Sequence, residues 1–187
     1  MLIIAIIADV TRLMVSLDEA AEVLNRFQFN MSCLQRFTNL RELWVIGKIY
    51  QYYELIFERD TGIKSSLQVE KLHFHLNIRI FRGYRSFVGM MPQLKHLHMK
   101  HSPKFLTWKD INQIVNVMSS DKMETLSFSN IQEMPSDFGK AEWKLTTVFA
   151  NGRGNNLRYL DLSHNGISSI GTNIHQALPN LQFLDLS

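Results

Sequence analysis

The most regular pattern of apolar and polar positions lies near the C-terminal end of the chain, in residues 157–187. Apolar residues recur there in the frame LxxLxLxxNxIxxI, which starts again 181 − 157 = 24 residues later. The first copy consists of Leu157, Leu160, Leu162, Asn165, Ile167 and Ile170, and the second begins with Leu181, Leu184 and Leu186. Positions four and six of the frame lie two residues apart, so on a strand they point to one side and their neighbours point to the other. One such strand cannot bury its apolar side alone, so the pattern predicts a stack of similar coils.

Four less regular copies of the frame precede this stretch. They are Leu40/Leu43/Val45, Val69/Leu72/Phe74, Leu94/Leu97/Met99 and Met123/Leu126/Phe128. By subtraction, successive starts are 29, 25, 29, 34 and 24 residues apart. Asn77 stands eight residues after Val69, as Asn165 stands eight residues after Leu157. The spacing therefore predicts an array of coils of unequal length.

These frames resemble leucine-rich repeats, and the resemblance covers roughly residues 40–187. It implies an α/β solenoid: an arc with a parallel concave β-sheet and helices or irregular coils on the convex side. We expect about five to six irregular repeats in residues 40–187, truncated at the C-terminus. In this family the asparagine of the frame satisfies backbone groups of the neighbouring coil, which implies that role for Asn165.

Residues 1–39 are expected to form an N-terminal apolar segment and a capping helix. The apolar run Leu2–Ala8 is compatible with a signal peptide, a buried strand or an interrupted first repeat. Ser16 and Glu19 form a capping-box pair, which predicts a helix over residues 16–28. A second helix is expected in the third coil, where Thr107 precedes an apolar stripe at helical spacing.

Composition excludes several classes of function. The net charge of +3 is mild and basic residues form no long run, so nucleic-acid binding is not indicated. Cys33 is the one cysteine, so no intrachain disulfide can form. The sequence contains no run of about 18 apolar residues, so it predicts no membrane span. The protein is expected to contact a membrane only through missing segments. Asn30 begins the sequon Asn-Met-Ser, a candidate glycosylation site.

The chain contains none of the motifs that we associate with catalysis. A glycine-rich phosphate loop, a nucleophile elbow and a HExxH pair are all absent from the sequence. A lone cysteine is more typical of a small buried side chain than of a nucleophile. We therefore expect no enzyme activity, no cofactor and no resident metal.

Basic and aromatic residues are concentrated at the positions predicted to face solvent on the concave sheet. Because parallel strands lie about 4.8 Å apart, Lys71 should flank His96, His73 should flank His98, and His75 should flank Lys100. Five of the seven histidines fall in or beside this block. The candidate ligand-binding residues of the concave face are Trp44, Lys71, His73, His75, His96, His98, Lys100, Tyr159 and Asp161.

Three interpretations of this block remain open. The first interpretation is a solvated polar face. The second is an anion-binding site that gains positive charge in acid, because histidines titrate near pH ~6.5. A metal site through His73 and His98 is the third, although two histidines need further ligands. Lysine neighbours would lower the histidine pKa values and disfavour a cation.

Two classes of function follow from the repeat pattern. The 24-residue coil, the Met134-Pro135…Phe138 ending and the sequon resemble Toll-like receptors, which implies a fragment of a pattern-recognition receptor ectodomain in innate immunity. The expected partner is then a protein or an anionic microbial-type ligand on the concave face, with possible receptor dimerisation in the full-length protein. The location would be the extracellular side of a membrane receptor, at the cell surface or in the endosome. The alternative is a cytoplasmic adaptor or scaffold, which the longer coils and the absence of disulfide caps favour.

Overall fold

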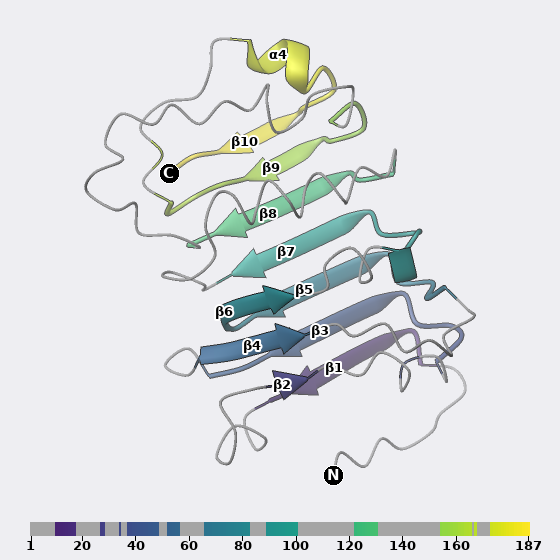
Figure 1. The fold of residues 1–187 in the computed structure, drawn as a ribbon. Helices are drawn as coiled ribbons and strands as arrows, with labels where there is room; N and C mark the ends of the chain where they lie inside the picture. Colours follow the sequence, from purple (N-terminus) through teal and green to yellow (C-terminus); the bar gives the residue numbers. More distant parts are fainter. Residues whose placement is uncertain are drawn as a thin grey trace.

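The structure is a computed structural model that describes residues 10–17, 27–28, 34, 37–48, 52–56, 66–82, 89–100, 122–130, 154–165, 167 and 173–187. Within these residues seven strands form one parallel sheet in the order of the sequence (Figure 1). The strands are β1 (Arg12–Ser16), β3 (Glu42–Ile46), β5 (Lys71–His75), β7 (His96–Lys100), β8 (Thr125–Ser129), β9 (Tyr159–Asp161) and β10 (Phe183–Asp185). The solenoid with a parallel sheet is therefore confirmed.

The apolar positions of the repeat frame form the core of this solenoid. Their side chains are buried in five successive coils and partly buried at Leu181, Leu184 and Leu186. Along β3, β5 and β7 buried and half-buried or exposed residues alternate, as expected for a sheet with one covered face. The register that the frames predict is confirmed, since Leu43, Leu72, Leu97, Leu126, Leu160 and Leu184 lie opposite one another in turn.

The inward asparagine of the regular coil has the role that the repeat pattern implies. Asn165 is 1% exposed, and its side-chain amide donates hydrogen bonds to the carbonyl of Phe128 in the preceding coil and to that of Leu162 (2.8 Å). Without Asn165 both carbonyls would be buried and would lack these hydrogen bonds, and leaving buried backbone groups unpaired destabilises the fold. Asn165 thus joins two neighbouring coils.

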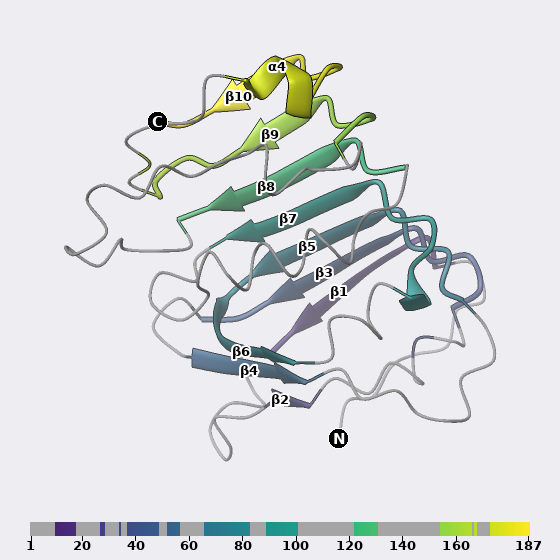
Figure 2. The ribbon, with the colours of Figure 1, turned by 45° about the horizontal axis from the view of Figure 1, so that its top comes forward.

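A second, short parallel sheet lies on the other side of the core, which the sequence did not predict. In the described residues it consists of β2 (Phe27–Gln28), β4 (Tyr52–Ile56) and β6 (Asn77–Arg82), in that order. Figure 2 shows these strands below the larger sheet, and in Figure 1 their arrows point in the direction opposite to those of the larger sheet. In the described residues of the first coils, the convex side therefore carries a short parallel sheet.

Tyr53 from β4 and Gly47 from the end of β3 hold the two sheets close together. Tyr53 is 3% exposed, and its hydroxyl accepts a hydrogen bond from the Lys48 amide (2.9 Å). A Cβ atom built on Gly47 would lie 2.6 Å from the Tyr53 ring. The glycine is required here because the ring occupies the space of any larger side chain.

The N-terminal region differs from the helix expected over residues 16–28. Ser16 is the last residue of β1, which pairs with β3 from Arg12↔Glu42 to Ser16↔Ile46, and Phe27–Gln28 form β2. The prediction is therefore wrong at both ends, and residues 18–26 lie outside the described residues. The pattern contained the missed signal: Val10, Leu13 and Val15 make a further frame, 40 − 10 = 30 residues before Leu40.

Four other expected features fall on residues that are not described: the apolar run Leu2–Ala8, the sequon at Asn30, the helix from Thr107 and the Met134-Pro135…Phe138 ending. On the convex side of the last coil, α4 (Ile174–Ala177) is a single helical turn. In the described part of the chain no helix is long and apolar enough to cross a membrane.

Candidate functional site

The candidate residues lie on the face of the seven-stranded sheet that points away from the core, here called the open face. The expected neighbours are confirmed: Lys71 pairs with His96, His73 with His98, and His75 with Lys100. The same register places Trp44 beside His73 and Met14 beside Trp44. The middle row of the open face is therefore Met14, Trp44, His73, His98, Ser127, Asp161 and Asp185.

Three rings in this row stack face to face and are here called the ring stack: Trp44, His73 and His98. The centroids of Trp44 and His73 are 3.8 Å apart with planes 5° from parallel, and those of His73 and His98 are 4.6 Å apart with planes 4° from parallel. Planar side chains can stack in this way because neighbouring parallel strands have a similar spacing, about 4.8 Å. His75 meets the Trp44 ring edge-on at 5.0 Å. The sequence-predicted block thus contains a set of stacked and edge-on rings.

Glu42 fixes the ring stack at one side, a role that sequence reasoning missed. The indole nitrogen of Trp44 donates a hydrogen bond to Glu42 (2.7 Å), and the Nε of Arg12 donates to the other carboxylate oxygen (2.9 Å). His73 Nε2 lies 3.6 Å from the same carboxylate and has no hydrogen-bond partner among the described residues. Burial raises the pKa of Glu42, but the hydrogen bonds from Trp44 and Arg12 outweigh it and leave the pKa lowered.

The two histidines of the ring stack are hard to protonate. Burial, then the neighbouring His98, lowers the pKa of His73 to about 4, and burial, then His96, lowers the pKa of His98 to about 4. Burial also lowers the pKa of His96, whose Nδ1 lies 3.0 Å from the Thr125 hydroxyl. Lys71 contributes less to the His73 shift than burial does. The expected gain of charge in a mildly acidic compartment is therefore wrong for His73 and His98.

The metal interpretation gains no support from this arrangement. Among the described residues no group of three or more His, Cys, Asp and Glu side chains is placed to hold a metal ion. His73 and His98 face each other as parallel rings, a geometry that does not point two ring nitrogens at one ion.

At the other end of the open face, Asp161 and Tyr159 have different surroundings. Asp161 is 8% exposed and accepts hydrogen bonds from the Ser127 hydroxyl (2.7 Å) and from the Ser163 hydroxyl (2.6 Å) and amide (3.0 Å). Burial raises its pKa, but these hydrogen bonds outweigh that effect and lower it. Tyr159 stacks on the exposed Phe183 of β10, with centroids 4.6 Å apart. Asp161 is therefore occupied by its own repeat, although it lies in the same row as the ring stack.

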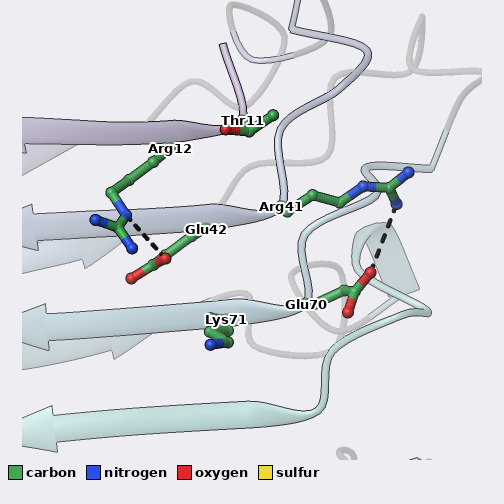
Figure 3. Close-up of a pocket in the computed structure, with 6 residues that line it drawn as sticks. All are labelled: Thr11, Arg12, Arg41, Glu42, Glu70 and Lys71. Carbon is green, nitrogen blue, oxygen red and sulfur yellow. Dashed lines mark hydrogen bonds and ion pairs between the residues drawn. The ribbon is translucent and has the colours of Figure 1, made fainter.

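A pocket of about 400 Å³ lies where β1, β3 and β5 begin, beside the ring stack. Thr11, Arg12, Arg41, Glu42, Glu70 and Lys71 line it, and Figure 3 shows Arg12 directed toward Glu42 and Arg41 toward Glu70. The ion-pair distances are 2.9 Å for Arg12–Glu42 and 3.7 Å for Arg41–Glu70. Sequence reasoning found Lys71 but missed Arg12, because it did not recognise the frame that begins at Val10. It also missed Arg41, which follows Leu40 and precedes the outward positions that were considered.

Comparison with known families supports the class of protein that this fold defines. Residues 155–187 match the family model described as Leucine Rich repeats (2 copies). Together with the seven-stranded parallel sheet, this match supports a leucine-rich repeat protein. No curated protein and no solved structure matches the chain. Repeats of this kind are suited to protein binding, because stacked coils create an extended concave surface.

Proposed function

We propose that this chain is a protein-binding module of a Toll-like pattern-recognition receptor, and that the open face receives the partner around the ring stack. The module binds and does not catalyse, and it acts on the extracellular side of a membrane receptor. The support for the receptor class is the resemblance of the repeat coils. The support for the binding surface is the ring stack itself.

The ring stack has the properties of an interface anchor. Trp44, His73 and His98 are half-buried and held in fixed orientations, so little side-chain entropy would be lost when a partner covers them. Tryptophan is among the residues most enriched where binding energy concentrates. Met14, 62% exposed in the same row, extends this apolar surface beyond Trp44. Met14 and Trp44 together offer a partner an apolar patch bordered by charged side chains.

Binding at this surface should be insensitive to mild acid. With pKa values of about 4, the imidazoles of His73 and His98 stay neutral from pH 7 to pH 5. A partner that needs a positive charge on His73 or His98 would not bind here in an endosome. We therefore expect equal affinity at pH 7 and pH 5.5 for a partner that contacts the ring stack.

Photo-crosslinking in the natural host tests the binding surface. A photoreactive residue at Met14 should capture a partner, and the same residue at Lys122, exposed at the edge of another coil, should not. Trp44→Ala should reduce capture at Met14 by about tenfold or more, as expected for an interface anchor. Phe183→Ala, a matched aromatic loss at the other end of the open face, should leave it unchanged. Equal capture at both sites, or equal loss in both variants, would refute the proposed surface.

A separate measurement tests the compartment. A receptor ectodomain should carry a glycan at Asn30, seen as a glycosidase-sensitive mass shift that Asn30→Gln abolishes. An unglycosylated chain recovered from cytosol would favour the adaptor alternative instead.

A further inference from the structure

The geometry points to a carboxylate-binding subsite in the pocket where β1, β3 and β5 begin, suited to an acidic side chain of the protein partner. This inference rests on the proposed function, because it presumes a protein partner on the open face. It adds the chemical class of the segment that binds and the direction in which it lies.

The positive charges of this pocket exceed the negative ones. Three cations line it, Arg12, Arg41 and Lys71, against two carboxylates. Both carboxylates are already engaged: Glu42 accepts hydrogen bonds from Arg12 and Trp44, and Glu70 accepts one from Lys95 (3.1 Å). The pKa of Glu70 is lowered, chiefly by the hydrogen bond from Lys95, which lies outside the pocket.

Two of the cations are consequently available to a ligand. Arg41 Nη1 lies 3.7 Å from Glu70, beyond hydrogen-bond distance, and donates two long hydrogen bonds (3.4 Å each) to the backbone and side-chain oxygens of Gln68. The Arg41 side chain is 49% exposed, so a carboxylate can still reach the guanidinium. Lys71 is exposed and makes no ion pair within the described residues. An incoming carboxylate can therefore bind both side chains without breaking a short ion pair. A guanidinium also binds a carboxylate through two parallel hydrogen bonds.

The two available cations suit a carboxylate on a protein partner. Arg12 pairs with Glu42 and Lys95 with Glu70, so Arg41 and Lys71 remain for the ligand. The flat guanidinium of Arg41 matches the two oxygens of a carboxylate, and Lys71 adds a second positive charge. On a protein partner the group with this chemistry is an aspartate or glutamate side chain.

The surroundings of the pocket give the bound segment a direction. Lys71 precedes His73 by two residues on β5, and Glu42 precedes Trp44 by two on β3, so the pocket adjoins the ring stack on the same face. At the far end of the open face Asp161 and Asp185 would repel an acidic group. The partner segment is thus expected to place an acidic side chain at β1–β5 and an apolar side chain on the ring stack beside it.

Titration with hexaglutamate, followed by fluorescence polarisation, tests the subsite on the full chain. Arg41→Gln/Lys71→Gln should raise the dissociation constant about five- to tenfold, as expected for the loss of two exposed ionic contacts. The matched control Arg158→Gln/Lys122→Gln removes the same charge from exposed positions outside the pocket, and should change it less than twofold. Lys71→Arg, which keeps the charge, should retain binding. Thermal unfolding curves check that each variant is folded.

In this titration three results would overturn the subsite: no binding of hexaglutamate, equal weakening in the two double variants, or tighter binding of inorganic phosphate than of hexaglutamate. None of these overlaps with failure of the proposed function. If a partner is captured at Met14 with undiminished yield in Arg41→Gln/Lys71→Gln, the binding surface stands and the subsite is refuted. If capture is lost in Trp44→Ala but not in Arg41→Gln/Lys71→Gln, the binding surface again stands and the subsite is refuted.

Discussion

The two ends of the solenoid share one parallel sheet and differ in the chemistry of its open face. At the β9–β10 end, residues 155–187 follow the consensus repeat closely enough to match the family model. Asp161 there is occupied by Ser127 and Ser163. At the β1–β7 end the coils are irregular, a second sheet covers the other side of the core, and the ring stack and the pocket lie side by side.

The inward and outward rows of the sheet explain this difference. Inward positions in every coil hold leucine, valine, methionine or phenylalanine, because each coil must bury its apolar face against the next. Outward positions have no such requirement, so their side chains change along the middle row from Trp44 and His73 to Ser127 and Asp161. The regular end therefore identifies the class of protein, and the irregular end carries the features that distinguish this chain.

Asn165 and Asn77 occupy the same position of the repeat at the two ends and should differ most on mutation. Asn165→Ala leaves the carbonyls of Phe128 and Leu162 without their side-chain donor, so we expect a loss of about 2–4 kcal/mol in unfolding free energy. Asn77 is 5% exposed, but its Oδ1 has no partner among the described residues. Asn77→Ala should therefore lose only about 1 kcal/mol. Urea denaturation of both variants measures the contrast, and equal losses would show that the two coils are joined in the same way.

Gly47→Ala tests the close contact between the two sheets at the irregular end. The new methyl group would lie 2.6 Å from the Tyr53 ring, which is buried and cannot easily move. We expect a loss of about 1–3 kcal/mol in unfolding free energy, typical of overpacking. Combining it with Tyr53→Leu should give less than the sum of the two single losses, because the clash is then removed. Gly89→Ala is the control, since nothing lies within 4 Å of a Cβ atom built there.

The ring stack should make stability depend on pH between about 6.5 and 4. The unfolded chain protonates histidine near pH 6.5, whereas folded His73 and His98 bind a proton only near pH 4. Between these values the unfolded state binds more protons, so the unfolding free energy falls as the pH falls, and it is fully retained above pH 6.5. Because both rings keep some contact with water, we expect a total loss of about 1–2 kcal/mol.

Two histidine variants test whether the pH dependence of stability comes from the open face. His73→Phe keeps a stacking ring and should flatten part of the pH profile, whereas His175→Gln, an exposed histidine of α4, should not change it. The other charged groups around the ring stack, Glu42, Lys71, Lys100 and Asp161, remain present in both variants. A profile as steep in His73→Phe as in the parent chain would assign the dependence to other groups.

The fold of the repeat array was predictable from sequence because burial and strand period leave few alternatives. The frames from Leu40 to Leu186 predicted the sheet, its register and the partners of His73 and His98 correctly. The frame at Val10 was overlooked because Ser16 and Glu19 also satisfy a capping box. In the structure Ser16 lies in β1, where tertiary packing against β3 decides its conformation. Local capping chemistry is weaker than the burial of Leu13 and Val15 in a shared core.

The candidate site was predictable in its position but not in its chemistry. Register placed the histidines and lysines together, yet it could not show that the rings stack, because stacking depends on side-chain rotamers. The sequence also gave no measure of burial, which dominates the lowered pKa values of His73 and His98. Arg12 and Arg41 joined the site only once β1 was placed beside β3.

The smallest expected effect concerns Glu70 and Glu124, which stand just before β5 and β8 at the same repeat position. Glu70 pairs with Lys95 and more distantly with Arg41, while Glu124 makes no side-chain ion pair within the described residues. Glu70→Gln should lower the unfolding free energy by about 0.5 kcal/mol, as for a partly exposed pair, and Glu124→Gln by less. The lowered pKa of Glu70 means that this contribution is present at neutral pH and is lost as the pH falls below its ordinary value of 4.5. In 1 M salt the two variants should become equal because exposed charges are then screened. A difference that persists in high salt would mean that Glu70 acts through packing at the irregular end rather than through its charge.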